Sequence, residues 1–140
     1  MKEWKPRPKP KRKLRIGVME SDGVVMPHPP IIRALRATTD LLRAAGHDVI
    51  DFEPYESQKA WDIARDAARD DYKKAYLRHW NETATKTKSK QPIDVLLCPC
   101  APSASFPHDF LPWWGYGSQF NMLDYPGVII PVGAVDKILD

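Results

Sequence analysis

The chain has 140 residues, of which 43% are hydrophobic and 28% are charged, a composition that suits one globular domain or a part of one. No apolar run approaches the roughly 18 residues that a membrane span requires, so no membrane partner is expected. The first residues lack the apolar core of a secretory signal, and a cytoplasmic location is predicted.

The net charge of +3 is distributed unevenly along the chain. Residues 1–15 hold eight Lys or Arg and one acidic residue, whereas residues 16–140 hold 13 basic and 17 acidic residues. Residues 1–13, spaced by prolines, are predicted to form a basic arm or linker. The run Lys9–Lys13 also fits a nuclear-localisation or polyanion patch. Because the rest of the chain is mildly acidic, nucleic-acid binding by the predicted domain, residues 14–140, is not expected.

The first half of that region predicts a strand, a helix and a second strand. Leu14–Met19 is a short apolar strand. From Pro30 to Ala45, apolar side chains recur at helical spacing, and Gly46 follows where helices commonly end. Asp48–Phe52 is the next strand. Short links between these elements favour a βαβ unit with a parallel pair of strands.

The second half predicts a further helix from about residue 57 to residue 81 and a third strand at Ile93–Cys98. An aromatic stretch, Leu111–Val132, then ends in an apolar run, Gly127–Val132, that suits a fourth, buried strand. The resulting order is β-α-β-α-β-short α-β. It predicts an α/β fold with a mostly parallel sheet and flanking helices.

The aromatic stretch has two interpretations. Aromatic rings beside a few polar groups commonly line ligand pockets. Aromatic side chains more often pack into a domain's own core. The substrate-binding candidates are Trp114, Tyr116, Asn121 and Asp124.

No self-sufficient active site is visible in the sequence. The nucleophile elbow, the Gly-rich phosphate loop and the HExxH metal motif are all absent. Ser103, Ser105, His108 and Asp109 lie too close together to assemble a triad without help from elsewhere. Cys98 and Cys100 have no second Cys pair or nearby His to complete a zinc site, and two buried thiols are expected instead. No catalytic residue, metal or cofactor is therefore predicted.

From residue 14 onward the chain resembles the C-terminal part of the amidase signature family, and its fungal acetamidase-like members in particular. The resemblance rests on short motifs in the family's order: Leu14-Arg-Ile-Gly-Val-Met19, Asp22-Gly-Val-Val25, Pro27-His-Pro-Pro30, Arg33-Ala-Leu35, Ala45-Gly-His47, Asp94-Val-Leu-Leu-Cys-Pro99, Trp114-Gly-Tyr116, Asn121-Met-Leu-Asp-Tyr-Pro126 and Pro131-Val132. It implies a partial amidase-signature fold, with the four pocket candidates beside the family's substrate cavity.

The same resemblance implies a hydrolase of C–N amide bonds that uses a Ser nucleophile, a bridging Ser and a Lys base. Those residues lie N-terminal to the part that is resembled, and this sequence contains neither a Ser-Ser nor a Gly-Gly pair. A second departure falls between Trp61 and Tyr72, where the family usually carries a long insertion. Both departures suggest a truncated gene product, an incomplete gene model or a remodelled remnant.

Two functions follow as expectations. The first is an amidase-like fragment, a pseudoenzyme inactive alone, that retains a wall for a small amide ligand. The second is a non-catalytic α/β module that pairs with a partner chain, or with itself, through an exposed sheet edge. A regulator directed to the nucleus by the basic arm is a weaker third option.

Overall fold

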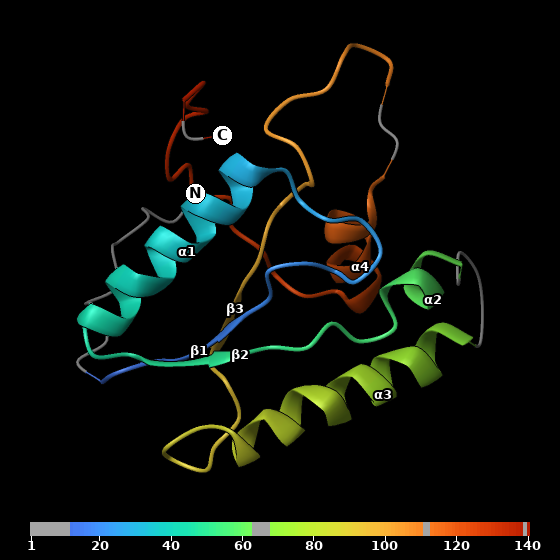
Figure 1. The fold of residues 1–140 in the computed structure, drawn as a ribbon. Coiled ribbons are helices and arrows are strands. Elements are labelled where there is room, and N and C mark those ends of the chain that lie inside the picture. Colours follow the sequence, from blue (N-terminus) through green and yellow to red (C-terminus); the bar gives the residue numbers. More distant parts are fainter. Residues whose placement is uncertain (1–11, 63–67, 111–112, 139) are drawn as a thin grey trace, which may run out of the picture.

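A computed structural model describes residues 12–62, 68–110, 113–138 and 140 (Figure 1). The predicted arm at residues 1–13 lies almost wholly outside the described residues. The elements are, in order, β1 (Arg15–Val18), α1 (Pro29–Ala44), β2 (Asp48–Asp51), α2 (Ser57–Asp62), α3 (Ala68–Glu82), the 3-10 turn η1 (Thr83–Thr85), β3 (Val95–Leu97) and α4 (Gly115–Leu123). None of the described helices is long and apolar enough to cross a membrane.

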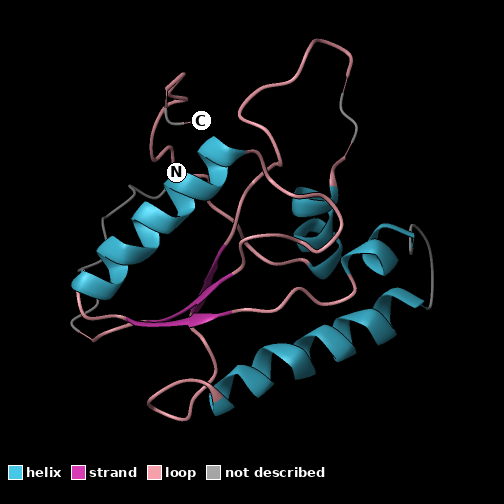
Figure 2. Cartoon of the chain, in the orientation of Figure 1, coloured by secondary structure: helices cyan, strands magenta, loops and turns pink. Residues whose placement is uncertain are grey.

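The three strands form a parallel sheet in the order β2-β1-β3 (Figure 2). Ile16 of the central strand pairs with Val49 of β2 on one side and with Val95 of β3 on the other. The predicted α/β class and parallel sheet are confirmed.

Alternating side chains of β1 separate the core into two parts. Ile16 and Val18 are buried with Leu35 of α1 on one face of the sheet. On the other face, a Cβ added to Gly17 would lie 2.7 Å from Ile93 Cδ1, so this position has no space for a larger side chain. That face carries the larger cluster, which includes Phe52, Tyr72, Tyr76, Tyr116 and Leu123 and so joins the sheet to α3 and α4. Helices therefore cover both faces (Figure 1).

Helix α1, predicted from Pro30 to Ala45, begins and ends one residue earlier, at Pro29 and Ala44. Pro29 and Pro30 occupy its first turn, where the N–H that proline lacks would bond nothing. Gly46 follows the helix with a φ of +80°, a conformation that glycine adopts without steric cost. The next strand, β2, starts two residues later.

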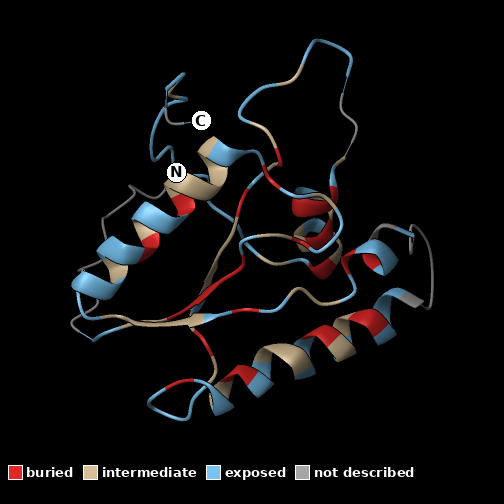
Figure 3. Cartoon of the chain, in the orientation of Figure 1, coloured by how far each residue is buried: buried red, intermediate tan, exposed pale blue. Residues whose placement is uncertain are grey.

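The predicted helix at 57–81 is two described helices, α2 and α3, and residues 63–67 between them lie outside the described residues. The predicted fourth strand is wrong. Residues 127–132 have no regular structure and no sheet partner among the described residues, and Val128, Ile129 and Ile130 are 86%, 77% and 67% exposed (Figure 3). An apolar run becomes a buried strand only where a neighbouring strand and a covering layer exist, and the described part of this chain supplies neither.

Candidate functional site

Helix α4 carries the predicted pocket residues on two different faces. Tyr116, Gln119 and Leu123 recur at helical spacing and are buried against the larger core cluster. Trp114 precedes the helix and is 57% exposed, and Asn121, seven positions later, is exposed as well. The helix therefore turns Tyr116 inward and leaves Trp114 and Asn121 on the solvent side.

The Tyr116 hydroxyl fastens α4 to the loop that follows β1. It donates a hydrogen bond to the Val25 carbonyl at 2.6 Å and accepts one from the Asp22 N–H at 3.1 Å. Burial raises the pKa of the Tyr116 phenol, so it stays protonated at neutral pH. Its donor and its acceptor are both used within the protein.

Asp22 is 2% exposed, and its carboxylate is held by three donors. Oδ1 accepts from the N–H groups of Val24 and Val25, at 3.0 and 2.9 Å. Oδ2 accepts from the Trp113 indole N–H at 2.6 Å. Gly115 leaves room for that indole, because a Cβ at Gly115 would lie 2.3 Å from the ring. A carboxylate enclosed in this way holds the loop and α4 together, and that is a structural role.

A second polar network joins α4 to α2 and α3. The Gln119 amide N–H groups donate to the Tyr72 hydroxyl at 2.8 Å and to the Tyr55 carbonyl at 3.2 Å. Its amide oxygen accepts from the Ser57 hydroxyl at 3.4 Å. Burial raises the pKa of Tyr72 to about 12, so this hydroxyl also remains a neutral donor and acceptor.

Asp124 ends α4 in the left-handed region, with a φ of 58°. Its carboxylate pairs with Lys73 and, at 3.0 Å, with Arg69 of α3. The Lys73 contact, with Arg69 adding to it, lowers the pKa of Asp124. Asp124 thus joins two helices as an ionised partner.

The four predicted residues lie in different environments. Two cavities, of about 380 and 250 Å³, lie elsewhere, and neither is lined by Trp114, Tyr116, Asn121 or Asp124. Tyr116 belongs to the core, Asp124 to a surface ion pair, and Trp114 and Asn121 to the open face of α4. A ligand-binding role for these residues stays a prediction.

The serines considered for nucleophilic chemistry make no hydrogen bond to a base among the described residues. The Ser103 hydroxyl donates to the Ser105 carbonyl at 2.7 Å, and no hydrogen bond between described residues links either serine to His108. The prediction of two buried thiols is wrong for Cys100 and only partly met by Cys98. Cys98 is half-buried, with its pKa raised by burial to about 12, whereas Cys100 is exposed. The described residues contain no group of three potential metal ligands.

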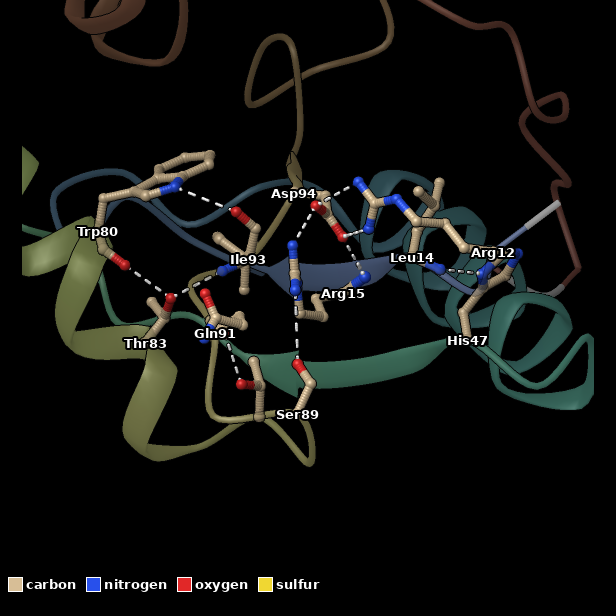
Figure 4. Close-up of polar contacts among 11 residues, drawn as sticks. Arg12, Leu14, Arg15, His47, Trp80, Thr83, Ser89, Gln91, Ile93 and Asp94 are labelled. Carbon is tan, nitrogen blue, oxygen red and sulfur yellow. Dashed lines mark hydrogen bonds and ion pairs between the residues drawn. The ribbon is translucent and has the colours of Figure 1, made fainter. Parts of the chain in front are cut away.

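The larger cavity opens at the amino-terminal ends of β1 and β2, and its polar framework is drawn in Figure 4. Asp94, just before β3, accepts hydrogen bonds from the guanidinium groups of Arg12 and Arg15 and from the backbone N–H of Arg15. The hydrogen bond from Arg12 is the largest of the effects that hold the pKa of Asp94 well below its usual range. The Asp94 carboxylate therefore stays ionised and holds the start of β3 against the start of β1.

Sequence reasoning missed Asp22, Trp113, Gln119 and Asp94. The Asp22-Gly23 pair is a turn signal whose side chain commonly bonds the following backbone, so part of the Asp22 role was visible in the sequence. The contact of Asp22 with Trp113 spans 91 positions, and no local pattern indicates it.

Comparisons with known proteins agree in pointing to one family. The family model described as Amidase matches residues 2–79. An amidase of Gibberella zeae is 34% identical over 176 residues, covering 92% of this chain and 32% of that protein. An acetamidase of Emericella nidulans is 28% identical, covering 91% of this chain and 31% of that protein.

A solved structure titled fatty acid amide hydrolase has a TM-score of 0.66 and 20% identity, covering 86% of this chain and 28% of that one. At this identity the likeness shows the fold. The chain spans about a third of the length of the curated relatives it matches. The match to the Gibberella zeae protein runs over 176 positions, more than the 140 residues here, so that relative has residues within the matched region that this chain lacks.

Proposed function

This chain belongs to the amidase family, and on that premise we propose that its 140 residues do not hydrolyse amides by themselves. One observation carries the proposal. The sequence has no Ser-Ser and no Gly-Gly pair, whereas the family's Ser nucleophile and bridging Ser lie in a Gly/Ser-rich segment. The chain is then an amidase-family pseudoenzyme unless another polypeptide supplies those groups.

The chemistry of amide cleavage supports this proposal. The reaction needs an activated nucleophile and donors that stabilise the oxyanion in fixed geometry. Loss of the nucleophile and its base costs several powers of ten in rate. Ser103 and Ser105 lie close to His108 in sequence, yet the Ser103 hydroxyl donates to the Ser105 carbonyl and accepts from the Ser105 N–H, and no hydrogen bond between described residues links either serine to His108.

The test is an assay of the purified chain against acetamide and a chromogenic aryl amide, beside a full-length amidase as positive control. We expect no release of ammonia or arylamine above the buffer rate. Turnover that a serine-directed reagent abolishes, and that Ser103→Ala or Ser105→Ala removes from a fresh preparation, would overturn the proposal. Turnover that survives both substitutions marks a co-purifying enzyme.

Binding of a small amide without turnover is a separate part of the proposal, and it rests on the open face of α4. Trp114 presents an exposed indole, and Asn121 presents an amide on the same face. Titration with benzamide should shift the Trp114 indole N–H resonance saturably, and Asn121→Ala should weaken that shift. Gln58→Ala, which removes an exposed amide on α2, is the matched control. Equal effects of the two variants would exclude a site on α4.

A second candidate function is a non-catalytic module that binds a partner chain or a second copy. The exposed run Val128–Val132 favours it, because contiguous apolar surface of this kind commonly marks a contact with another chain. Edge strands β2 and β3 each have one side without a strand among the described residues. A cytoplasmic location stays a prediction.

Sedimentation velocity over a range of concentrations tests this second function. We expect association that Ile129→Asp weakens, whereas Ile138→Asp, at a position 93% exposed outside that run, leaves it unchanged. A monomer at every concentration, combined with no complex after passage over a complementary amidase polypeptide, would eliminate the module.

A further inference from the structure

The amino-terminal end of the sheet carries more positive charge than its acids balance. Four cationic side chains line the cavity of about 380 Å³, together with Gly46, His47, Ser89 and a single carboxylate, Asp48; the cations are Arg12, Lys13, Arg15 and Lys88. This charge contrasts with residues 16–140 as a whole, which hold 17 acidic and 13 basic residues. The excess is therefore local to the cavity, and in the sequence it continues into the basic residues 1–15.

The ion pairs of these cations do not neutralise their positive charge. Arg12 and Arg15 share one carboxylate, Asp94, at 2.9 and 2.5 Å (Figure 4). Two guanidinium groups on one carboxylate retain a net positive charge. Lys13 donates to the Ala45 carbonyl at the end of α1, which carries no full charge.

Lys88 has no acidic partner for its ammonium group among the described residues. Asp48, the carboxylate of the cavity, accepts a hydrogen bond from the backbone N–H of Lys88 at 2.7 Å, and no ion pair joins the two side chains. The hydrogen bond to Asp48 fixes the backbone of Lys88 at the rim of the cavity, and the Lys88 ammonium group keeps its three N–H donors.

The rest of the loop that carries Lys88 and Ser89 is held firmly. The Thr83 hydroxyl accepts from the Ile93 N–H at 3.0 Å, and the Trp80 indole donates to the Ile93 carbonyl at 3.2 Å (Figure 4). Thr87, 1% exposed, donates to the Gln91 carbonyl at 2.6 Å. A rim positioned by such bonds binds a ligand with little loss of conformational freedom.

Two neutral donors complete the set. His47 Nδ1 accepts from the Leu14 N–H at 3.1 Å, which places the ring hydrogen of the neutral tautomer on Nε2. The Ser89 hydroxyl accepts from Arg15 at 3.5 Å and keeps its own hydrogen to donate. Cavity-lining donors thus come from separate points: the ammonium of Lys88, the hydroxyl of Ser89 and the imidazole of His47.

We propose that this cavity binds a phosphate-type oxyanion through Lys88, Ser89 and His47, beside the guanidinium pair of Arg12 and Arg15. A tetrahedral oxyanion accepts hydrogen bonds from several directions, which suits donors that line one cavity from three separate positions. A carboxylate ligand prefers a planar, bidentate partner, and here the guanidinium edges already bind Asp94. A long polyanion would meet the acidic remainder of the chain, so a small ligand is favoured.

The test is titration of the full chain with inorganic phosphate at constant ionic strength, followed by amide resonances. We expect saturable shifts at His47, Lys88 and Ser89. Lys88→Glu should weaken phosphate binding by about tenfold or more, because a charge reversed at a few ångströms changes the Coulomb energy by more than one factor of ten in affinity.

Lys86→Glu is the matched control. It makes the same charge change on the same loop, at an exposed residue that does not line the cavity. It should alter binding less than twofold. Equal losses in the two variants would show nonspecific attraction and overturn the site, as would the absence of saturable shifts. Thermal melts of both variants verify that each is folded.

Adenosine monophosphate and a short single-stranded oligonucleotide distinguish the source of the phosphate group. Competition by the mononucleotide at Lys88 assigns a small phosphate ester. If only the oligonucleotide shifts these resonances, and free phosphate does not, the small-ligand site is excluded. None of these outcomes depends on whether the chain hydrolyses amides.

Discussion

Helix α4 and the segment that follows it are neighbours in sequence and have opposite environments. Tyr116 and Leu123 of α4 are 1% and 4% exposed, whereas Val128 and Ile129, a few positions later, are 86% and 77% exposed. Both stretches are apolar. Hydrogen bonds distinguish the two stretches. Tyr116 bonds to the loop after β1, and Gln119 bonds to Tyr72 of α3 and to the Tyr55 carbonyl just before α2. No hydrogen bond between described residues involves the backbone of 127–132.

The difference shows that hydrophobicity alone does not decide what this chain buries. Apolar area gives a driving force without direction. Directional bonds from Asp22 and Tyr72 select which apolar element docks on the sheet and where. The run at 128–132 has the same driving force but no backbone hydrogen-bond partner among the described residues.

Removal of the Tyr116 side chain should have the largest effect on stability. Tyr116→Ala deletes a fully buried ring and should lower the free energy of unfolding by about 3–5 kcal/mol. Tyr116→Phe keeps the ring and leaves the Asp22 N–H and Val25 carbonyl without their partner, which should cost about 1–3 kcal/mol. Urea unfolding measures both. If Tyr116→Phe is neutral, the hydroxyl does not anchor α4.

Leu123→Ala tests the apolar face of the same helix. A leucine that is 4% exposed should lose about 2–5 kcal/mol of unfolding free energy on truncation, since it leaves a cavity. The measurement is the same urea titration, with unchanged slope as the sign that folding remains cooperative. A loss below about 1 kcal/mol would mean that α4 docks loosely in solution.

Asp94→Asn examines a polar anchor at the other end of the sheet, and should cost about 1–3 kcal/mol at pH 7. The folded-state pKa of Asp94 is lowered by its Arg12 and Arg15 partners relative to an ordinary value of about 3.9. The unfolded chain therefore takes up the proton at higher pH than the folded one. The stabilisation is present above about pH 4 and is lost as the pH falls further. Stability curves of the two proteins should converge on acidification, and a constant gap from pH 7 to pH 3 would contradict this role.

Ile129→Ala should have the smallest effect. The side chain is 77% exposed, so its truncation should change the unfolding free energy by no more than about 0.5 kcal/mol. Urea unfolding of Ile129→Ala and Leu123→Ala side by side compares the stability contribution of the exposed run with that of α4. A cost near that of Leu123→Ala would show that the run is buried in solution, and would remove the basis for a partner at this surface.

Local sequence patterns predicted most of the fold. Period-3.6 spacing, Pro30 in the first turn and Gly46 after the last one indicated α1 within two residues of its bounds. Apolar runs predicted β1, β2 and β3. These predictions succeeded because each of the three strands has a partner strand among the described residues. The same reasoning failed at residues 127–132, since composition reports a preference for burial and not the presence of a partner strand.

The site was less predictable than the fold. Trp114, Tyr116, Asn121 and Asp124 were grouped because they share one stretch of sequence, and helical geometry then separated Tyr116 from Trp114 and Asn121. The contacts that define the environment of α4 connect it to Asp22, which lies 94 positions before Tyr116. Single-sequence reasoning has no access to pairings at that distance.

The bond between Asp22 and α4 also constrains the order in which the chain folds during synthesis. Strand β1, helix α1 and strand β2 are complete by residue 51 and can pair while the ribosome is still translating the remainder. Asp22 lies within that unit, in the loop between β1 and α1, yet its indole and phenol partners are Trp113 and Tyr116. Until they emerge, the Asp22 carboxylate lacks its Trp113 donor and the Asp22 N–H lacks its acceptor, the Tyr116 hydroxyl. Long-range closure of this kind slows folding, so α4 can complete the cover on this face of the sheet only after residue 116 has been synthesised.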